Sequence, residues 1–413
     1  MLARLIDADV VLRAGRNRGV QALIGAAFVF YLVYHLTRFQ FAQMWPIALL
    51  GDAAILFEAS RDTFTRGAYP DGTFPYSPSA VILFRALGLP GPTIFMLGWY
   101  VLMAAGLVVS VRAALTQERA EIRAAWPLIG AIAVVLASSP ISWDLRNANS
   151  NLVYLGLVMA GYGLAGRRPM LAGVLVGLSV SLKLYSGLLM AWLMVNGPRR
   201  MFYAGAVAMV VLWVALPLAL FGLDGTLRLY AGWREQVAHI ADLTYHTALA
   251  ANRETGPPLV TLHKAIVNLT GESFQSFLTQ AWLWELRAIW FAALAWYVWR
   301  CRRCLLAAAP SRAALADWTV LLLAPLPFSP WLEPYHAIPL LVGAMLCAAI
   351  ALDRQIERRD RWIALAALAA LALFLVVRVP FAIRGLQLLV QFLALVIALG
   401  LLRPRLAPLP ASG

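Results

Sequence analysis

The stretch "RRPMLAGVLVGLSVSLKLYSGLLMAWLMVNGPRR", residues 167–200, decides the class of fold to which this chain belongs. Paired arginines stand at both ends, and the apolar run between them is interrupted by Lys183 near its middle. A spanning helix needs roughly 20 apolar residues, and arginines mark the cytosolic ends of such helices. Because one span cannot begin and end on the same side, we expect two short helices that meet around Lys183 and return.

The rest of the chain has the same apolar character. Of its 413 residues, 62% are hydrophobic and only 13% are charged, which is far more apolar than an average soluble domain. We therefore expect an all-α polytopic membrane protein, a single domain over 1–413 with about twelve transmembrane segments. Both termini are expected in the cytosol. Two large external loops, 41–90 and 222–278, are expected to carry interfacial helices.

The charge pattern excludes several other classes. The net charge is +14, but blocks of arginine alternate with apolar runs, which fits the positive-inside rule better than nucleic-acid binding. No cleavage site follows the first apolar stretch, so we expect a signal anchor. Three cysteines are too few for a disulfide framework. No nucleotide-binding or metalloprotease motif is present, and the sequence predicts neither a cofactor nor a metal.

Asp52 begins the segment "DAAILFEASRDTF", residues 52–64, in the first external loop. Its mixture of apolar and charged residues predicts an amphipathic helix lying at the membrane interface. A carboxylate in that position is partly desolvated, which raises its pKa and suits it to act as a general base. The alternative is an ordinary helix-capping aspartate.

Two further segments on the same side are unusually polar. Glycines and prolines in "GAYPDGTFPYSP", residues 67–78, exclude a regular helix and predict a shaped loop. Its Tyr76 could stack on a sugar or anchor the loop at the headgroup level. In "NANSN", residues 147–151, helix capping explains one asparagine, whereas a hydroxyl-rich ligand would also explain Asn149 and Asn151.

Two cationic or titratable groups complete the candidate site. Lys183 lies far from the ends of its apolar run, so we favour an anion site over snorkelling to the interface. The segment "SPWLEPYH", residues 329–336, joins two predicted spans and supplies Trp331, Tyr335 and His336. A histidine can donate to a phosphate or carry a proton, although a lone histidine is more often structural.

Taken in chain order, these segments resemble glycosyltransferase family 87 over roughly residues 40–350. Its members are integral-membrane enzymes with the C-type glycosyltransferase fold, typified by polyprenol-phosphate-mannose-dependent mannosyltransferases. The resemblance implies that Asp52 is the catalytic base that deprotonates the acceptor hydroxyl. It also implies that Lys183 and His336 bind the donor phosphate.

The family pattern is not matched at every position. Asn149 stands where the family has glutamine. Ser186, three residues after Lys183, stands where the family has proline. These departures leave the sugar and the acceptor open. The residues that we expect to contact the substrates are Tyr76, Asn149, Asn151, Trp331 and Tyr335.

The resemblance implies an inverting transferase at the outer face of the cytoplasmic membrane. It would move a sugar, such as mannose, from a polyprenyl-phosphate donor to a glycolipid or glycan acceptor, surrounded by membrane lipids and without nucleic acid. A transporter or flippase of a lipid-linked or small polar solute is the alternative, because it would also place Lys183 in a cavity. The absence of a visible internal repeat favours the enzyme. A weaker alternative is a non-catalytic partner in an envelope-building complex.

Overall fold

The computed structural model describes residues 8–40, 51–70, 76–241, 277–301, 311–324, 326, 334–376 and 384–406, and in these residues the chain is helical without strands. The first part contains α2 (Ala8–Arg16), α3 (Arg18–Gln40), α4 (Gly51–Arg66), α5 (Pro78–Gly88), α6 (Pro92–Ala114), α7 (Ala120–Ala124), α8 (Trp126–Leu136), α9 (Ser138–Asn147), α10 (Asn151–Leu164) and α11 (Pro169–Leu182). The second part contains η2 (Leu184–Ser186), α12 (Gly187–Asn196), α13 (Arg199–Val210), the π-helix η3 (Val211–Ala215), α14 (Leu216–Ala241), α17 (Phe277–Cys301), α18 (Arg312–Leu323), η5 (Pro334–Ala337), α19 (Leu340–Leu352), α20 (Arg358–Val376) and α21 (Arg384–Leu406).

Helices α6 and α10 approach each other closely enough to exclude side chains between them. A Cβ atom on Gly106 would lie 2.2 Å from the carbonyl oxygen of Leu152, and one on Gly156 would lie 2.4 Å from the Cα of Gly106. Helices in lipid associate through this kind of backbone contact, because burial of apolar surface gives little driving force there. The two glycines therefore determine how α10, which begins at the candidate site, is held against α6.

Helices α11 and α13 also meet through glycines, and the pairing shows their relative direction. A Cβ on Gly173 would lie 2.0 Å from the oxygen of Met201, and one on Gly177 would lie 2.6 Å from the oxygen of Gly205. The contacts advance in the same direction along both helices, so α11 and α13 run parallel and α12 between them must return. Lys183 is extended (φ −142°, ψ 110°) between the two short helices. This is the arrangement expected from the two arginine pairs.

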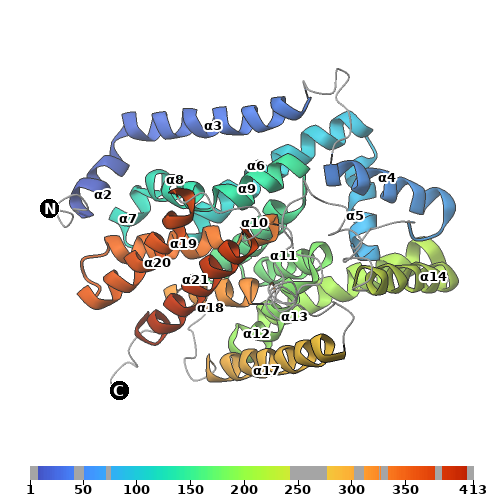
Figure 1. Ribbon diagram of the computed structural model, residues 1–413. Coiled ribbons are helices and arrows are strands. Elements are labelled where there is room, and N and C mark those ends of the chain that lie inside the picture. The colour runs from blue at the N-terminus through green and yellow to red at the C-terminus, as the bar shows by residue number, and fades with distance from the viewer. Residues whose placement is uncertain are drawn as a thin grey trace.

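Helix α19 lies among α8, α18, α20 and α21 in the left part of Figure 1. It packs against α6, α8, α18, α20 and α21, and the apolar window Tyr335–Leu352 is entirely buried. In contrast, only 11% of the apolar window within Arg199–Ala238 is buried. A helix that is apolar all round either lies in a protein core or faces lipid, and these two windows of the described chain illustrate the two cases.

The structure supports a helical membrane protein. Among the described residues, Pro92–Ala113, Arg199–Ala238 and Tyr335–Leu352 are long and apolar enough to cross a membrane. A fourth span would be formed by α8 and α9 together, which bend by 80° where they meet. Other apolar helices of the described part are shorter, so the expected twelve segments remain a prediction.

The two segments expected as external loops with interfacial helices do contain helices. Helix α4 forms as expected and contacts α5, α6 and α9. In the region expected as the second loop, α14 is interrupted at Gly222 (φ 65°) and then continues to Ala241. The sequence after this glycine again mixes apolar and charged residues, so a helix resumes. Residues 242–276 lie outside the described part of the chain.

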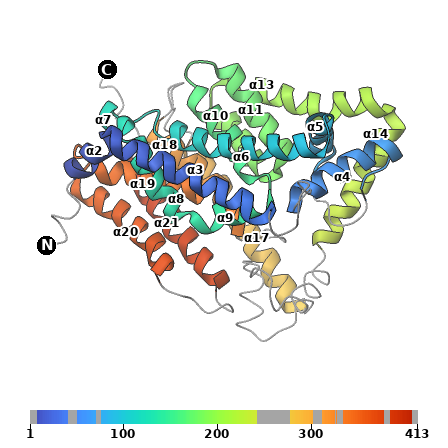
Figure 2. The ribbon, with the colours of Figure 1, turned by 90° about the horizontal axis from the view of Figure 1, so that it is seen from above.

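Buried ion pairs connect the segment after α6 with the start of α18 and the end of α19. The Nε of Arg312 donates to Glu118 at 2.9 Å, and its Nη2 donates to Asp353 at 2.7 Å (Figures 1 and 2 show the helices involved). The side chains of Glu118 and Asp353 are 0% and 4% exposed. Burial alone would raise the pKa of Asp353, but hydrogen bonds from Arg312 and from the backbone of Gln355 outweigh it, so this pKa is lowered.

We predict that Arg312→Met lowers the free energy of unfolding by about 3–5 kcal/mol, because it removes the cation from the buried Glu118 and leaves Asp353, among the described residues, with only Arg119, at 3.4 Å. Thermal unfolding of the purified protein in detergent would measure the change. The matched control is Arg354→Met, whose ion pair with Asp9 is half exposed and which we expect to cost less than about 1 kcal/mol. Equal melting temperatures for the two variants would contradict the prediction.

Candidate functional site

A buried hydrogen bond joins two distant parts of the chain at one end of the helical assembly. The Nδ2 of Asn149, which follows α9, donates to Oδ2 of Asp52 at the start of α4. The side chain of Asn149 is buried, and Asp52 is partly buried. Helix α4 also contacts α9 directly, so the pairing is supported by packing as well as by the hydrogen bond.

The orientation of the Asn149 amide follows from its other partners. Its Oδ1 accepts from the backbone N–H of Ser150 at 2.7 Å and from Nδ2 of Asn151 at 2.7 Å. A backbone N–H can only donate, so the oxygen must face Ser150 and the NH₂ group must face Asp52. Asp52 therefore receives a donor on one carboxylate oxygen, and within the described residues no donor reaches its other oxygen, which can accept a proton.

The turn that carries Asn149 has an uncommon backbone conformation. Ala148 adopts the left-handed region (φ 46°, ψ 42°), which is unfavourable for a residue with a Cβ. Two hydrogen bonds hold it: Trp99 Nε1 donates to the oxygen of Ala148 at 2.9 Å, and the N–H of Asn149 donates to the backbone oxygen of Asp144 at 3.1 Å. The turn ends α9 and points the side chain of Asn149 toward α4.

Asp144 is the anchor of this turn. Its carboxylate is completely buried and accepts from Asn151 Nδ2 and from the N–H of Leu152, each at 2.9 Å. Both donors belong to the first turn of α10, where unpaired N–H groups favour a negative charge. Asp144 thus connects the end of α9 to the beginning of α10.

Lys183 and Tyr76 form the other side of the network. The Nζ of Lys183 lies 3.5 Å from the Tyr76 hydroxyl and 4.8 Å from the centre of its ring. The same hydroxyl is 3.1 Å from Oγ of Ser150 and 3.5 Å from Oδ1 of Asn149. Tyr76 is thus a bridge between the ammonium group and the asparagine that binds Asp52.

The environment of Asp52 affects its protonation. Helix α4 lies outside the candidate membrane spans. Burial of the Asp52 carboxyl group raises its pKa above the ordinary value. The charge of Lys183 and the hydrogen bond from Asn149 act in the opposite direction and only partly compensate. A carboxyl group with a raised pKa is a stronger base when it is ionised, which suits proton abstraction.

The structure brings together five of the residues selected from the sequence: Asp52, Tyr76, Asn149, Asn151 and Lys183. Tyr335 and His336 lie in η5, which packs against α9, so they are close to the helix that carries Asp144. A direct role for these two residues with Lys183 stays a prediction. Trp331 lies outside the described residues.

The amide of Asn151 is already engaged within the protein. Its two N–H groups point to Asp144 and Asn149, and its Oδ1 accepts from the Tyr185 hydroxyl at 3.2 Å. The structure therefore gives Asn151 a positioning role. The expected contact of Asn151 with a substrate stays a prediction.

Sequence reasoning missed Asp144 and Tyr185. Asp144 precedes the quoted segment "NANSN" by three residues, and nothing in the surrounding sequence distinguished it from an ordinary surface acid. Tyr185 follows Lys183 by two residues, and only the break between α11 and α12 turns its hydroxyl toward Asn151. Among the described residues, no three His, Cys, Asp or Glu side chains are grouped to hold a metal ion.

Chemically, the arrangement places a basic carboxylate and an ammonium group in one network. A carboxylate can accept a proton from a hydroxyl, and an ammonium group can stabilise a negatively charged leaving group. Both functions are useful in a transfer between a hydroxyl and an anionic donor.

Comparison with known proteins gives one match. The sequence model of glycosyltransferase family 87 matches residues 74–330. This range is more than half of the chain and includes Tyr76, Asn149 and Lys183. Asp52 and His336 lie outside the matched range. No curated protein and no solved structure matches this sequence.

We predict that Asp144→Leu destabilises the protein by about 2–4 kcal/mol, because Asn151 and the N–H of Leu152 lose their buried acceptor. Denaturation of the purified protein in detergent would measure it. Asp62→Leu is the control, since Asp62 pairs with arginines on the exposed side of α4 and should change stability by less than about 1 kcal/mol. A similar effect of both substitutions would exclude the anchoring role of Asp144.

Proposed function

Because this chain belongs to glycosyltransferase family 87, and membership implies transferase activity, we propose that it transfers a sugar from a polyprenyl-phosphate donor to a hydroxyl of a glycolipid or glycan. Mannose is the sugar that we propose to test first. The observation that supports the proposal most strongly is the network that links Asp52, through Asn149 and Tyr76, to Lys183. It combines the two charged groups that such a transfer requires.

Asp52 acts as the general base in this proposal. Its free carboxylate oxygen takes the proton of the acceptor hydroxyl while that oxygen forms a bond to the anomeric carbon of the sugar. The Asn149 amide holds the carboxylate in place and stabilises its ionised form. Correct positioning of a base contributes typically 10²–10⁴-fold to a rate.

Lys183 acts on the leaving group. As the new bond forms on one face of the sugar, the bond between the anomeric carbon and the phosphate oxygen breaks on the other, so the configuration inverts. The electron pair of that bond stays on the phosphate, and the ammonium group stabilises the additional negative charge. His336 is proposed as a second donor to the phosphate. This scheme requires neither a nucleotide nor a metal.

We place the reaction at the outer face of the cytoplasmic membrane. Helix α10 begins at the site, with Asn151, and α11 ends there before Lys183. At their opposite ends the two helices are joined through Arg167 and Arg168. Under the positive-inside rule these arginines face the cytosol, so the site faces outward. Cytosolic termini and about twelve spans belong to the same proposal.

Asp52→Asn should reduce transfer at least about 100-fold, because an amide cannot accept the proton. The assay is transfer of label from radiolabelled polyprenyl-phosphate mannose into a membrane-lipid extract by the purified protein. Glu58→Gln is a suitable control, since Glu58 is an exposed carboxylate on the same helix α4 and its loss should leave the rate unchanged.

Two results would contradict the proposal in different ways. Full activity of the Asp52→Asn variant would show that Asp52 is not the general base, although the protein would still be a transferase. Movement of the labelled lipid across a liposome membrane without any covalent transfer by wild type would favour the transporter alternative.

The acid side of the pH profile provides an independent check. Asp52 must be ionised to act, so the rate falls as the pH falls through its pKa, and because burial raises that pKa the fall begins above the ordinary aspartate range near 3.9. Asn149→Ala removes a hydrogen bond that lowers the pKa, so it should move the acid limb to higher pH. Single-turnover rates measured across pH would show this. If the acid side of the pH–rate profile of Asn149→Ala lay at the same pH as in wild type, Asp52 would not be the group that titrates there.

A further inference from the structure

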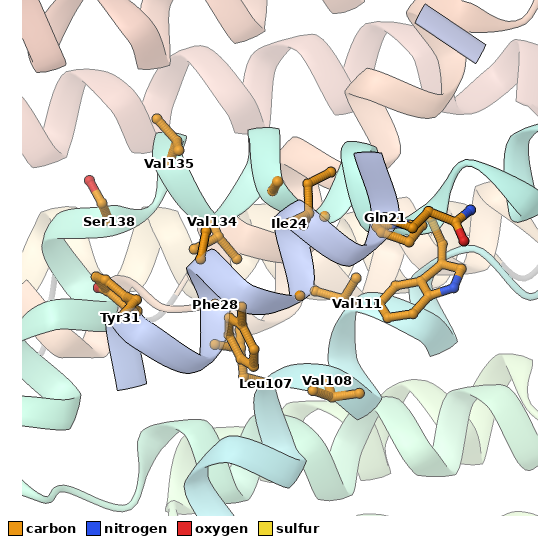
Figure 3. A pocket seen from close by; sticks show the side chains of 16 residues that line it. Gln21, Ile24, Phe28, Tyr31, Leu107, Val108, Val111, Val134, Val135 and Ser138 are labelled. Atoms are coloured by element: carbon orange, nitrogen blue, oxygen red, sulfur yellow. The ribbon is translucent and has the colours of Figure 1, made fainter. Parts of the chain in front are cut away.

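An apolar groove lies between α3, α6 and α8, away from the polar network. It has a volume of about 470 Å³, which is within the range of ligand pockets. Figure 3 shows Gln21 at one end of the groove, and Tyr31 with Ser138 at the other. Apolar side chains such as Phe28 and Val134 line the length between them. Polar groups are therefore confined to the two ends.

Hydrogen bonds from α3 hold it at both ends of the groove, through Gln21 and Tyr31. Near its start, Gln21 Nε2 donates to the backbone oxygens of Gly15 at 2.9 Å and Ala124 at 3.2 Å. Farther along, the hydroxyls of Tyr31 and Ser142 are 2.7 Å apart. The groove is thus bounded by fixed contacts at both ends.

The surface of α3 around the groove is suited to contact with lipid. The outer face of α3 exposes large apolar side chains, including Leu23 at 70% and Phe30 at 72%. A helix with this surface faces lipid in a membrane protein, and the groove runs along its inner side. An apolar space left empty forfeits the dispersion contacts of its lining, whereas the surrounding bilayer offers acyl chains.

Three exposed arginines are carried by the elements that meet at the Gln21 end: Arg18 on α3, Arg112 on α6 and Arg123 on α7, where Ala124 accepts from Gln21. We call these three residues the basic mouth of the groove. Arg18 precedes Gln21 by one helical turn, and the guanidinium of Arg112 lies 5.6 Å from the ring centre of Trp126, which lines the groove. Within the described part of the chain, no ion pair involves these three arginines. A phosphate is the group that matches such a cluster.

We propose that the groove binds one acyl chain of an anionic phospholipid, whose phosphate lies in the basic mouth. The length of the groove is apolar and only its Gln21 end is cationic, which matches the two parts of such a lipid. A transmembrane helix of a partner is about 10–12 Å wide with its side chains and needs a broader face than a groove of about 470 Å³ bounded by three helices. The assignment concerns a structural lipid and does not involve the reacting sugar.

Native mass spectrometry of the full-length protein provides the first test. Delipidated wild type would be incubated with dioleoyl phosphatidylglycerol or with dioleoyl phosphatidylcholine, which has the same chains and no net charge. We expect wild type to retain the first about tenfold better. The variant Arg18→Gln/Arg112→Gln/Arg123→Gln should lose this preference. The control Arg167→Gln/Arg168→Gln/Arg199→Gln, with three exposed arginines remote from the groove, should keep it.

A second pair of variants tests the groove itself. Gly25 on α3 lines the groove, and a Cβ added there meets no atom within 4 Å. Gly25→Leu therefore adds an apolar side chain at the groove from an unobstructed Cβ and should abolish retention of either lipid. Gly98 on α6 is equally unobstructed and exposed, so Gly98→Leu should bind like wild type. Both substitutions replace a glycine within a helix by leucine, so their effects on helix propensity are the same.

Three outcomes would overturn the proposal. Equal retention of the two lipids by wild type would remove the role of the basic mouth. Wild-type retention by Gly25→Leu would place the lipid elsewhere. Displacement of phosphatidylglycerol by a polyisoprenyl phosphate, itself not retained by Gly25→Leu, would assign the groove to an isoprenoid chain and exclude the phospholipid.

Discussion

The two hydrogen bonds that the carboxylate of Asp144 accepts determine the shape of the site around it. A buried carboxylate is costly unless its oxygens meet donors, and the donors here come from Asn151 and Leu152 at the start of α10. Satisfying them brings the end of α9 against α10 and leaves Ala148 to make the turn. Asn149 then faces Asp52 because of that turn.

The network also depends on the break between α11 and α12. Because the chain is extended at Lys183, the last carbonyl groups of α11 need partners from outside the helix. The hydroxyl of Ser77 donates to the oxygen of Ser181 at 2.8 Å, and this places the segment with Tyr76 beside the lysine. The interruption that exposes Lys183 therefore also fixes the loop that contacts it.

The residues of the site could be predicted from the sequence only where their residue type was unusual for their surroundings. Lys183 was visible because a charge within an apolar run is rare, and the paired arginines on both sides predicted the reversal that α11 and α13 confirm. Asp144 left no such mark, since its function arises only when α9 and α10 meet. A helix after Gly222 agrees with the interfacial helices expected in that external loop, but its bounds were not predicted, because its charged residues resemble those of a surface connection.

The network shows why Asn151 was difficult to interpret from its residue type alone. An asparagine beside two others suggested a ligand, but its three hydrogen-bonding groups are used by Asp144, Asn149 and Tyr185. Sequence spacing cannot distinguish a donor that faces a substrate from one that faces a neighbour. That distinction depends on the direction of the side chain after folding.

The complete burial of α19 has a consequence for biosynthesis. Two of its neighbours, α20 and α21, are translated after it, so its final surroundings do not exist when it leaves the ribosome. Its surface is apolar on all sides, so lipid can solvate it as well as the protein interior can. The helix can thus remain stably in the bilayer as an early intermediate and exchange lipid contacts for protein contacts once the last helices have been inserted.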